Sequence, residues 1–350
     1  MTASLRILVT GATGAVGSVV LRALTAAGHR VHGVSRRGGA GPRQHVWWAG
    51  REEPPPALRI RWDAVVHCAA DTRWNLPDEE AEEATVQPLR AVLSLASAHT
   101  HVLHLSSSYA TGLTGGVSSP SRDDYRNSYE WAKAASERLV RTAREGADIV
   151  RFPLVAGARA DGALDRYSGF FWLPAALCSG AIPALVAAEK GLVDMVSTDD
   201  VAAHVTRLVA DGRPARHRLT ILGRGERAPR VREIFDSMRD TLNSWRSAHG
   251  VPPLDRLPSV TPEQWNRFHR PFAEQYLDRA QLLRIAAFQV YQGYLSVTEP
   301  FDVTHQVPDM EQTIVRSVRR WADTHRRAAA RIPQPWYDRR TASAGSSRGS

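Results

Sequence analysis

The sequence predicts an α/β protein built on a doubly wound parallel sheet, with a smaller and mostly helical lobe toward its C-terminal end. Three observations indicate this fold. Short apolar runs alternate with helical patterns over residues 5–222. A glycine-rich turn joins the first apolar run to the first helical pattern. From about residue 222 to about residue 331 the strand-like runs fade, and the pattern is mostly helical.

The expected strands are short runs rich in Val, Ile and Leu, and each is bounded by turn residues. They are residues 5–9, 31–34, 46–48, 64–67, 102–105, 149–152, 192–196 and 219–222. Helical patterns separate most of them: the first ends before Gly28, and two longer ones cover 79–98 and 129–145. Strands joined through helices run parallel, so helices are expected on both faces of the sheet.

Composition narrows the class of protein. The 350 residues are 43% hydrophobic and 23% charged, which suits one large α/β domain with a smaller lobe. The two cysteines, Cys68 and Cys178, have no metal-ligand spacing, so no metal site and a reduced compartment are expected. The N-terminus shows no secretory signal, and we expect a cytoplasmic protein.

Charge and hydropathy argue against two kinds of partner. More than half of the net charge of +9 falls after residue 324, in a tail without the interleaved basic and aromatic residues of a nucleic-acid site. No nucleic-acid partner is therefore expected. Residues 169–188 are uncharged and as long as a membrane span, but Pro174, Gly180 and Pro183 interrupt them. A buried helix and turn is the simpler interpretation, and membrane contact is not expected.

The glycine-rich turn indicates a nucleotide. Gly11, Gly14 and Gly17 form GxxGxxG between a strand and a helix, the arrangement that brings a dinucleotide pyrophosphate against backbone N–H groups at a helix N-terminus. The alternative is a tight turn without a ligand. After the second strand the chain reads Ser35, Arg36, Arg37, and arginine there favours NADP(H) over NAD(H) because it can pair with the 2′-phosphate. Arginines in a solvated loop are the other interpretation.

A candidate acid–base pair stands four residues apart, as Tyr129 and Lys133 in the stretch NSYEWAKAASE. On a helix this spacing puts both side chains on one face, where a lysine charge can lower the pKa of a phenol. By itself the spacing is weak evidence, because an exposed tyrosine and a solvated lysine would look the same.

Five segments together resemble the extended short-chain dehydrogenases/reductases, in that family's order, across about residues 5–222. They are TGATGAVG, DAVVHCAADTRW, VLHLSSSYATG, NSYEWAKAASERLV and IVRFPLVAG. The HCAA and VLHLSSSYATG segments look most similar to the branch of fatty-acyl reductases and carrier-protein thioester reductases. The resemblance implies a Rossmann fold and hydride transfer between a nicotinamide cofactor and a carbonyl carbon.

The resemblance also assigns roles. Tyr129 would exchange the proton on the carbonyl oxygen, Lys133 would lower its pKa and hold the nicotinamide ribose, and Ser107 would polarise the carbonyl. The triple serine leaves Ser106 and Ser108 as alternatives for that last role. The residues expected to hold the cofactor are Gly11, Thr13, Gly14, Ala15, Val16, Gly17, Ser35, Arg36, Arg37, Cys68, Ala69, Ala70, Lys133, Phe152, Pro153 and Val155.

Two departures from the family pattern stand out. The family has an Asn in the helix before the fifth strand, and this chain reads Thr85-Val86-Gln87 there, which puts in doubt any support of Lys133 through water. The third strand, HVWWAGREE, also lacks the Asp-Leu pair that commonly touches adenine. A non-catalytic nucleotide-binding relative is therefore one of the alternatives.

The expected division of the chain follows. Residues 1–157 and 192–222 form the dinucleotide-binding domain, 158–191 and 223–331 form the substrate lobe, and 332–350 form a disordered tail. The lobe is rich in aromatic residues, which suits an acyl chain or another hydrophobic substrate, free or bound to a carrier protein. An NADPH-dependent reductase is the leading hypothesis, and an epimerase or dehydratase of nucleotide sugars with tightly bound NAD is the alternative. A homodimer is left open.

Overall fold

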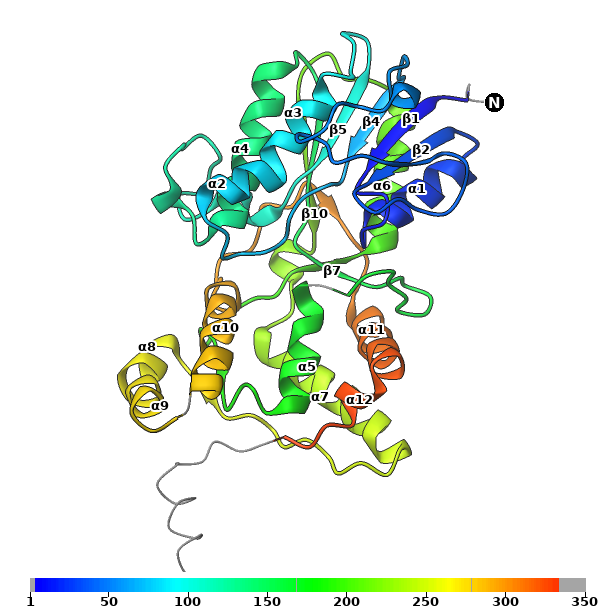
Figure 1. Cartoon of the computed structure of the whole chain (residues 1–350). Coiled ribbons are helices and arrows are strands. Elements are labelled where there is room, and N and C mark those ends of the chain that lie inside the picture. Colours follow the sequence, from blue (N-terminus) through cyan, green and yellow to red (C-terminus); the bar gives the residue numbers. More distant parts are fainter. Residues whose placement is uncertain (1–3, 168, 278, 334–350) are drawn as a thin grey trace, which may run out of the picture.

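A computed structural model describes residues 4–167, 169–277 and 279–333. A parallel sheet with helices on both faces forms the upper part of the molecule in Figure 1, and a mostly helical lobe lies below it. The predicted fold class is confirmed. The tail predicted to be disordered lies outside the described residues from 334 onward.

The main sheet has eight strands in the order β12-β10-β6-β5-β4-β1-β2-β3, and each pair of neighbours is parallel. The strands are β1 (Arg6–Thr10), β2 (Arg30–Ser35), β3 (Gln44–Val46), β4 (Ala64–His67), β5 (His101–Leu105), β6 (Asp148–Arg151), β10 (Arg218–Gly223) and β12 (His305–Gln306). From β1 the chain first builds outward through β2 and β3, and then crosses to β4 on the other side. Ligands of such sheets bind at this reversal, beyond the carboxyl ends of the strands.

Two details of the sheet differ from prediction. The run at 192–196 contributes only β9 (Met195–Ser197), which pairs with β7 (Leu154–Ala156) in a separate small sheet. The eighth strand is instead β12, which lies in the range expected for the substrate lobe and is too short and polar to give a strand pattern.

Helices cover the two faces of the sheet. On one face α1 (Gly17–Ala26) packs against α6 (Thr198–Asp211) over Ile7 and Val9. The other face carries α2 (Asp78–Ala81), the π-helix η2 (Glu82–Val86), α3 (Gln87–Leu93) and α4 (Ser128–Ala143). The single helix expected over 79–98 is therefore three pieces, because Pro88 cannot donate an N–H within a helix and the π-turn before it absorbs the change.

The lobe is a helical assembly around one apolar core that the chain enters three times. Its helices are α5 (Trp172–Ser179), α7 (Val231–Ala248), α8 (Pro262–Gln264), η7 (Trp265–His269), α9 (Arg270–Tyr276), α10 (Arg279–Leu295), α11 (Glu311–Thr324) and α12 (Arg326–Ala329), and β8 (Leu185–Val186) pairs with β11 (Ser259–Val260). The uncharged run at 169–188 folds as η5 (Gly169–Phe171), α5 and β8. Within the described ranges no helix is both long and apolar enough to cross a membrane.

A buried ionic cluster joins three strands at the amino end of the sheet. The Asp148 carboxylate, fully buried at the start of β6, accepts hydrogen bonds from His101 Nε2 at 2.6 Å and from the Arg218 guanidinium. Burial alone would raise the pKa of Asp148, but these donors outweigh it and hold the pKa below its ordinary value. The carboxylate stabilises the fold as long as it is charged.

We expect Asp148→Asn to lower the free energy of unfolding by about 3 kcal/mol, because the change removes the buried charge that accepts the hydrogen bonds of His101 and Arg218. Glu53→Gln is the matched control: it removes an exposed pair with Arg59, which should contribute about 1 kcal/mol or less. Urea denaturation of the two variants measures the difference. Equal stability of both variants would contradict the role given to Asp148.

Candidate nucleotide-binding and catalytic site

The glycine-rich turn between β1 and α1 is packed backbone against backbone. Gly11 has a φ of +66°, and a Cβ on it would lie 2.9 Å from the Ala69 nitrogen. A Cβ on Gly17 would lie 2.2 Å from the Gly11 carbonyl oxygen. Glycine is therefore required at both positions, and the N-terminus of α1 approaches the turn closely enough to leave its N–H groups facing a ligand.

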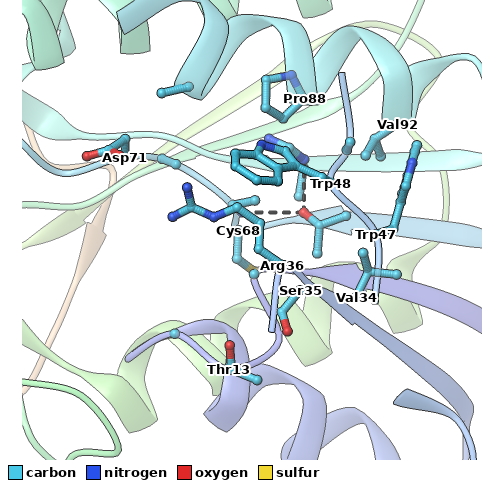
Figure 2. A pocket seen from close by; sticks show the side chains of 18 of the residues that line it. Thr13, Val34, Ser35, Arg36, Trp47, Trp48, Cys68, Asp71, Pro88 and Val92 are labelled. Carbon is cyan, nitrogen blue, oxygen red and sulfur yellow. Dashed lines mark hydrogen bonds between the residues drawn. The ribbon is translucent and has the colours of Figure 1, made fainter. Parts of the chain in front are cut away.

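A pocket opens next to this turn, at the carboxyl ends of β1, β2 and β4 (Figure 2). It encloses about 950 Å³ including the part open to solvent. The predicted cofactor residues that line it are Gly11, Thr13, Gly14, Ser35, Arg36, Arg37, Cys68, Ala69 and Ala70. The predicted residues that do not line it are Ala15, Val16, Gly17, Lys133, Phe152, Pro153 and Val155. The pocket thus brings together the set expected around the adenosine and pyrophosphate half of a dinucleotide.

Several lining residues were not predicted from the sequence. Trp48 follows β3, its ring is 41% exposed, and the Arg51 guanidinium carbon lies 4.8 Å from the ring centroid. Trp48 lies in the segment HVWWAGREE, where the Asp-Leu pair that commonly touches adenine is missing. The absence of that pair was the sequence feature that could have pointed to Trp48. Arg166, in the loop after β7, also lines the pocket, and no sequence pattern marks it.

The two arginines after β2 lie in the pocket with unpaired charge. Within the described part of the chain neither guanidinium makes a hydrogen bond or salt bridge, although the charge of Arg36 acts on Asp71. Asp71 itself pairs with Arg73 at 2.9 Å. Burial tends to raise the pKa of Asp71, and the Arg73 hydrogen bonds more than offset this and lower it. Arg36 and Arg37 are therefore available for an anionic ligand.

The candidate catalytic residues meet where α4 begins against the end of β5. Asn127 caps α4 by accepting the Glu130 N–H at 3.1 Å, which places Tyr129 and Lys133 one turn apart. Tyr129 is half-buried and close enough to Ser107 for that side chain to lower its pKa, while Lys133 is buried and donates from Nζ to the Leu105 carbonyl at 2.8 Å. The interpretation as an exposed tyrosine and a solvated lysine does not hold.

The electrostatics of the pair differ from expectation. Burial raises the pKa of Tyr129, the Ser107 hydrogen bond lowers it less, and the neighbouring Glu130 charge raises it further. The predicted lowering by Lys133 is not found, because its ammonium is directed to the Leu105 carbonyl. Burial also lowers the pKa of Lys133 to about 8, so that this lysine can lose a proton near neutrality. Cys68 has its thiol pKa raised to about 12 by burial, consistent with a small packing residue.

The three consecutive serines, Ser106, Ser107 and Ser108, differ in their hydrogen-bond partners. Ser106 donates to the buried Glu137 carboxylate at 2.6 Å, and Glu137 also receives two hydrogen bonds from Arg151. Ser107 Oγ instead accepts from Tyr109 N at 3.2 Å, and Ser107 also lowers the pKa of the nearby Tyr129. Ser108 is buried, and its hydroxyl has no partner among the described residues. Of the three serines, Ser107 is the one whose contacts lead to the tyrosine.

An aromatic cluster lies beside this group, between the sheet and the lobe. Its members are Trp74, Tyr109, Trp172, Tyr291 and Tyr294, whose rings meet at centroid distances of 4.4–4.7 Å. Tyr294 of α10 also accepts a hydrogen bond from Asn127 Nδ2 at 2.6 Å. The surroundings of Tyr129 on the lobe side are therefore apolar and aromatic.

Comparison with known proteins agrees with these observations. The model of the NAD dependent epimerase/dehydratase family matches residues 7–220, which is more than half of the chain. No curated protein sequence matches the chain significantly.

Three solved structures with a similar fold are reductase or R domains and an enzyme bound to NAD and UDP. One is the terminal R domain from the myxalamid PKS-NRPS biosynthetic pathway, with a TM-score of 0.67 at 17% identity over 95% of this chain and 94% of that chain. The PhqB reductase domain from Penicillium fellutanum gives 0.60 at 17% identity over 92% and 94%. The Bordetella bronchiseptica enzyme WbmG, in complex with NAD and UDP, gives 0.60 at 17% identity over 92% and 96%. At these identities the likeness concerns the fold.

We expect Gly17→Ala to weaken dinucleotide binding by about tenfold or more, because the new Cβ would overlap the Gly11 carbonyl oxygen and displace the turn. Gly116→Ala is the matched control, since a Cβ there meets only the Ser118 hydroxyl at 3.9 Å. Nucleotide titration by calorimetry measures both. Unchanged affinity in Gly17→Ala would mean that the turn does not carry the ligand.

Proposed function

Because the chain belongs to the NAD dependent epimerase/dehydratase family, we propose that it is an NADPH-dependent oxidoreductase of the extended short-chain type. Its substrate is a carbonyl compound or an acyl thioester bound to coenzyme A or to a carrier protein, with a hydrophobic acyl part. The observation that carries the proposal is the placement of Ser107 close enough to Tyr129 to lower its pKa, with Lys133 one helical turn away, at the same edge of the sheet as the nucleotide pocket.

Ser107, Tyr129 and Lys133 have different roles in the proposed reduction. The cofactor supplies a hydride to the carbonyl carbon when it is bound. Ser107 donates a hydrogen bond to the carbonyl oxygen, where negative charge develops. Tyr129, whose raised pKa keeps it protonated, transfers its proton to that oxygen as the general acid. Lys133 is buried, and the Leu105 carbonyl holds its ammonium in place.

The aromatic cluster supports a hydrophobic substrate. Trp74, Tyr291 and Trp172 offer ring faces and edges rather than the many polar groups that a sugar requires. One similar structure is an R domain from a PKS-NRPS biosynthetic pathway and another is a reductase domain, and an acyl chain delivered as a thioester would fit the same apolar surroundings.

A second candidate is an epimerase or dehydratase of nucleotide sugars with tightly bound NAD, favoured by the family match and by the similarity to WbmG with NAD and UDP. The unpaired Arg36 and Arg37 count against it, because two positive charges suit a 2′-phosphate. Mass spectrometry of nucleotide released from the purified, undialysed protein separates the two: near-stoichiometric NAD favours the epimerase, and exchangeable NADP(H) favours the reductase.

Tyr129→Phe should lower kcat for NADPH-dependent reduction by a factor of about 10² to 10⁴, because the phenol proton is lost while the ring stays in place. Ser107→Ala should lower it less, since Tyr129 remains as the acid. Activity is measured with a series of aldehydes and acyl-CoA thioesters of increasing chain length. A Tyr129→Phe variant with undiminished turnover would refute the acid role, and loss of nucleotide binding would show a structural defect instead.

The double variant Arg36→Ala, Arg37→Ala should weaken NADPH binding by about tenfold to a hundredfold and leave NADH binding nearly unchanged, because only NADPH carries the 2′-phosphate. Arg30→Ala, an exposed arginine at the start of β2 and away from the pocket, is the matched control. Dissociation constants from fluorescence titration give the ratio. Equal losses for both nucleotides would contradict the preference for NADP(H).

A further inference from the structure

Three polar side chains form a row across the sheet, under the helices that carry the candidate site. Thr10, His67 and His104 end β1, β4 and β5 or lie one residue from their ends, and they stand opposite one another in register. Each is at most 2% exposed. Their neighbours on the same face are apolar, so a continuous line of polar groups at this position needs a reason beyond packing.

The row is only partly hydrogen-bonded. Thr10 Oγ1 accepts the Ala69 N–H at 3.3 Å and lies within hydrogen-bond distance of His67 Nδ1, at 2.9 Å, where the tautomer of His67 decides which group donates. His67 and His104 stack with ring centroids 5.7 Å apart. Among the described residues, His67 Nε2 and both ring nitrogens of His104 have no hydrogen-bond partner. Three such nitrogens in one buried place are the polar lining that an ordered internal water requires.

The row of Thr10, His67 and His104 runs from the nucleotide pocket toward Lys133. At one end Thr10 and His67 line the nucleotide pocket, which is open to solvent. At the other end the charge of Lys133 lowers the pKa of both histidines, after the larger effect of burial, and brings that of His67 to about 3. Both rings are therefore neutral at pH 7, and a neutral imidazole has one N–H donor and one acceptor nitrogen.

We propose that Thr10, His67 and His104, with water held between the rings and Lys133, conduct protons from the nucleotide pocket to Lys133. The inference rests on the proposed function, in which Tyr129 gives up one proton per turnover. It also accounts for the Asn that the helix before β5 lacks: Thr85 stands there, and its hydroxyl already accepts the Asp71 N–H at 3.3 Å. In this chain the strands, rather than that helix, supply Lys133 with water.

Solvent replaces the proton that Tyr129 loses in each turnover. When hydride from NADPH reaches the carbonyl carbon, the Tyr129 O–H bond breaks and its proton joins the carbonyl oxygen. The phenolate then takes a proton that leaves a Lys133 N–H bond. Lys133 regains it through water from His104, each imidazole accepting a proton at one nitrogen and releasing one at the other. One proton enters from the pocket through the Thr10 hydroxyl, and NADP⁺ is the oxidised product.

Few other titratable groups face this path. Besides the two histidines, two groups act on the pKa of Lys133: the Cys68 thiol, which lies after β4, and the Glu137 carboxylate on the same helix as the lysine. Glu137 is held by Arg151 and Ser106, and Cys68 is protonated because burial raises its pKa. The pKa of Lys133 is about 8 and that of Cys68 about 12, so a pH effect near pH 8 reports on the lysine rather than on the thiol.

The sequence offers a direct probe, because it contains only two lysines, Lys133 and the exposed Lys190. In protein labelled with ¹⁵N-lysine, NMR resolves the exchange of each ammonium with solvent, and Lys190 serves as the internal reference. The matched pair is Thr10→Val, which removes the hydroxyl at nearly constant volume, and Thr10→Ser, which keeps it. His104→Phe interrupts the middle of the row, and His104→Gln retains hydrogen-bonding groups there.

We expect Thr10→Val and His104→Phe to slow the exchange of Lys133 by about tenfold, and Thr10→Ser and His104→Gln to stay much nearer the parent, with Lys190 unchanged in all four. The kcat for reduction of decanal should fall in the first two variants, most strongly above pH 8, with KM unchanged. Circular dichroism verifies folding, and if His104→Phe does not fold the threonine pair decides.

The outcomes separate the inference from the proposed function. Slowed exchange at Lys133 without turnover of any aldehyde or thioester supports the proton path and removes the reductase proposal. Turnover with exchange equal to the parent in both Thr10→Val and His104→Phe overturns the path and leaves the reductase proposal in place. Equal slowing in Thr10→Ser and Thr10→Val would also overturn it, because the effect would then come from packing.

Discussion

The site depends on one buried ion pair. Glu137 on α4 is fully buried and receives two hydrogen bonds from Arg151 on β6, at 2.7 and 2.8 Å, while Ser106 at the end of β5 donates to the same carboxylate. Two strands and one helix thus meet at a single group. Because Ser107 follows Ser106, and Tyr129 and Lys133 lie on the same helix as Glu137, this contact sets the distance between the serine and the tyrosine.

A buried pair of this kind is a poor source of net stability, since removing two charges from water costs nearly as much as their attraction returns. Its value is geometric. An apolar contact would let α4 slide or rotate slightly, whereas a bidentate guanidinium–carboxylate pair has one good geometry. Acid–base chemistry at Tyr129 needs hydrogen-bond distances held within a fraction of an ångström, so a rigid helix position matters more here than added stability.

The strands, the turn and the catalytic stretch could be predicted from the sequence because local rules decide them. Apolar runs and glycine spacing placed β1, β2, β4, β5, β6 and β10 within a residue or two. The predictions failed where tertiary contacts decide. β12 is a strand only because β10 offers it a free edge, and the helix expected over 79–98 divides at a π-turn that periodicity cannot reveal.

The site shows the same division. The motifs identified residues that line the pocket beside the glycine-rich turn, but Arg166 reaches the pocket from a loop far along the chain, so no local pattern could find it. The pKa of Tyr129 was expected to fall because the spacing puts a lysine on its face of the helix. The direction was wrong because spacing gives a neighbour without its orientation: the Lys133 ammonium is hydrogen-bonded to Leu105, and burial then dominates.

Burial of the site explains why the pKa values of four of its ionisable groups all shift in the direction that favours the uncharged form. The same burial raises the pKa of Tyr129, lowers that of Lys133 to about 8 and keeps His67 and His104 neutral. Burial therefore moves the pKa values of Tyr129 and Lys133 apart from their nearly equal values in water, so a Tyr129 phenolate readily takes a proton from the Lys133 ammonium. Lys133 must then regain its proton from outside the pair. A site of this kind needs a supply of protons more than a strong acid, and polar groups set into an otherwise apolar sheet face can provide one.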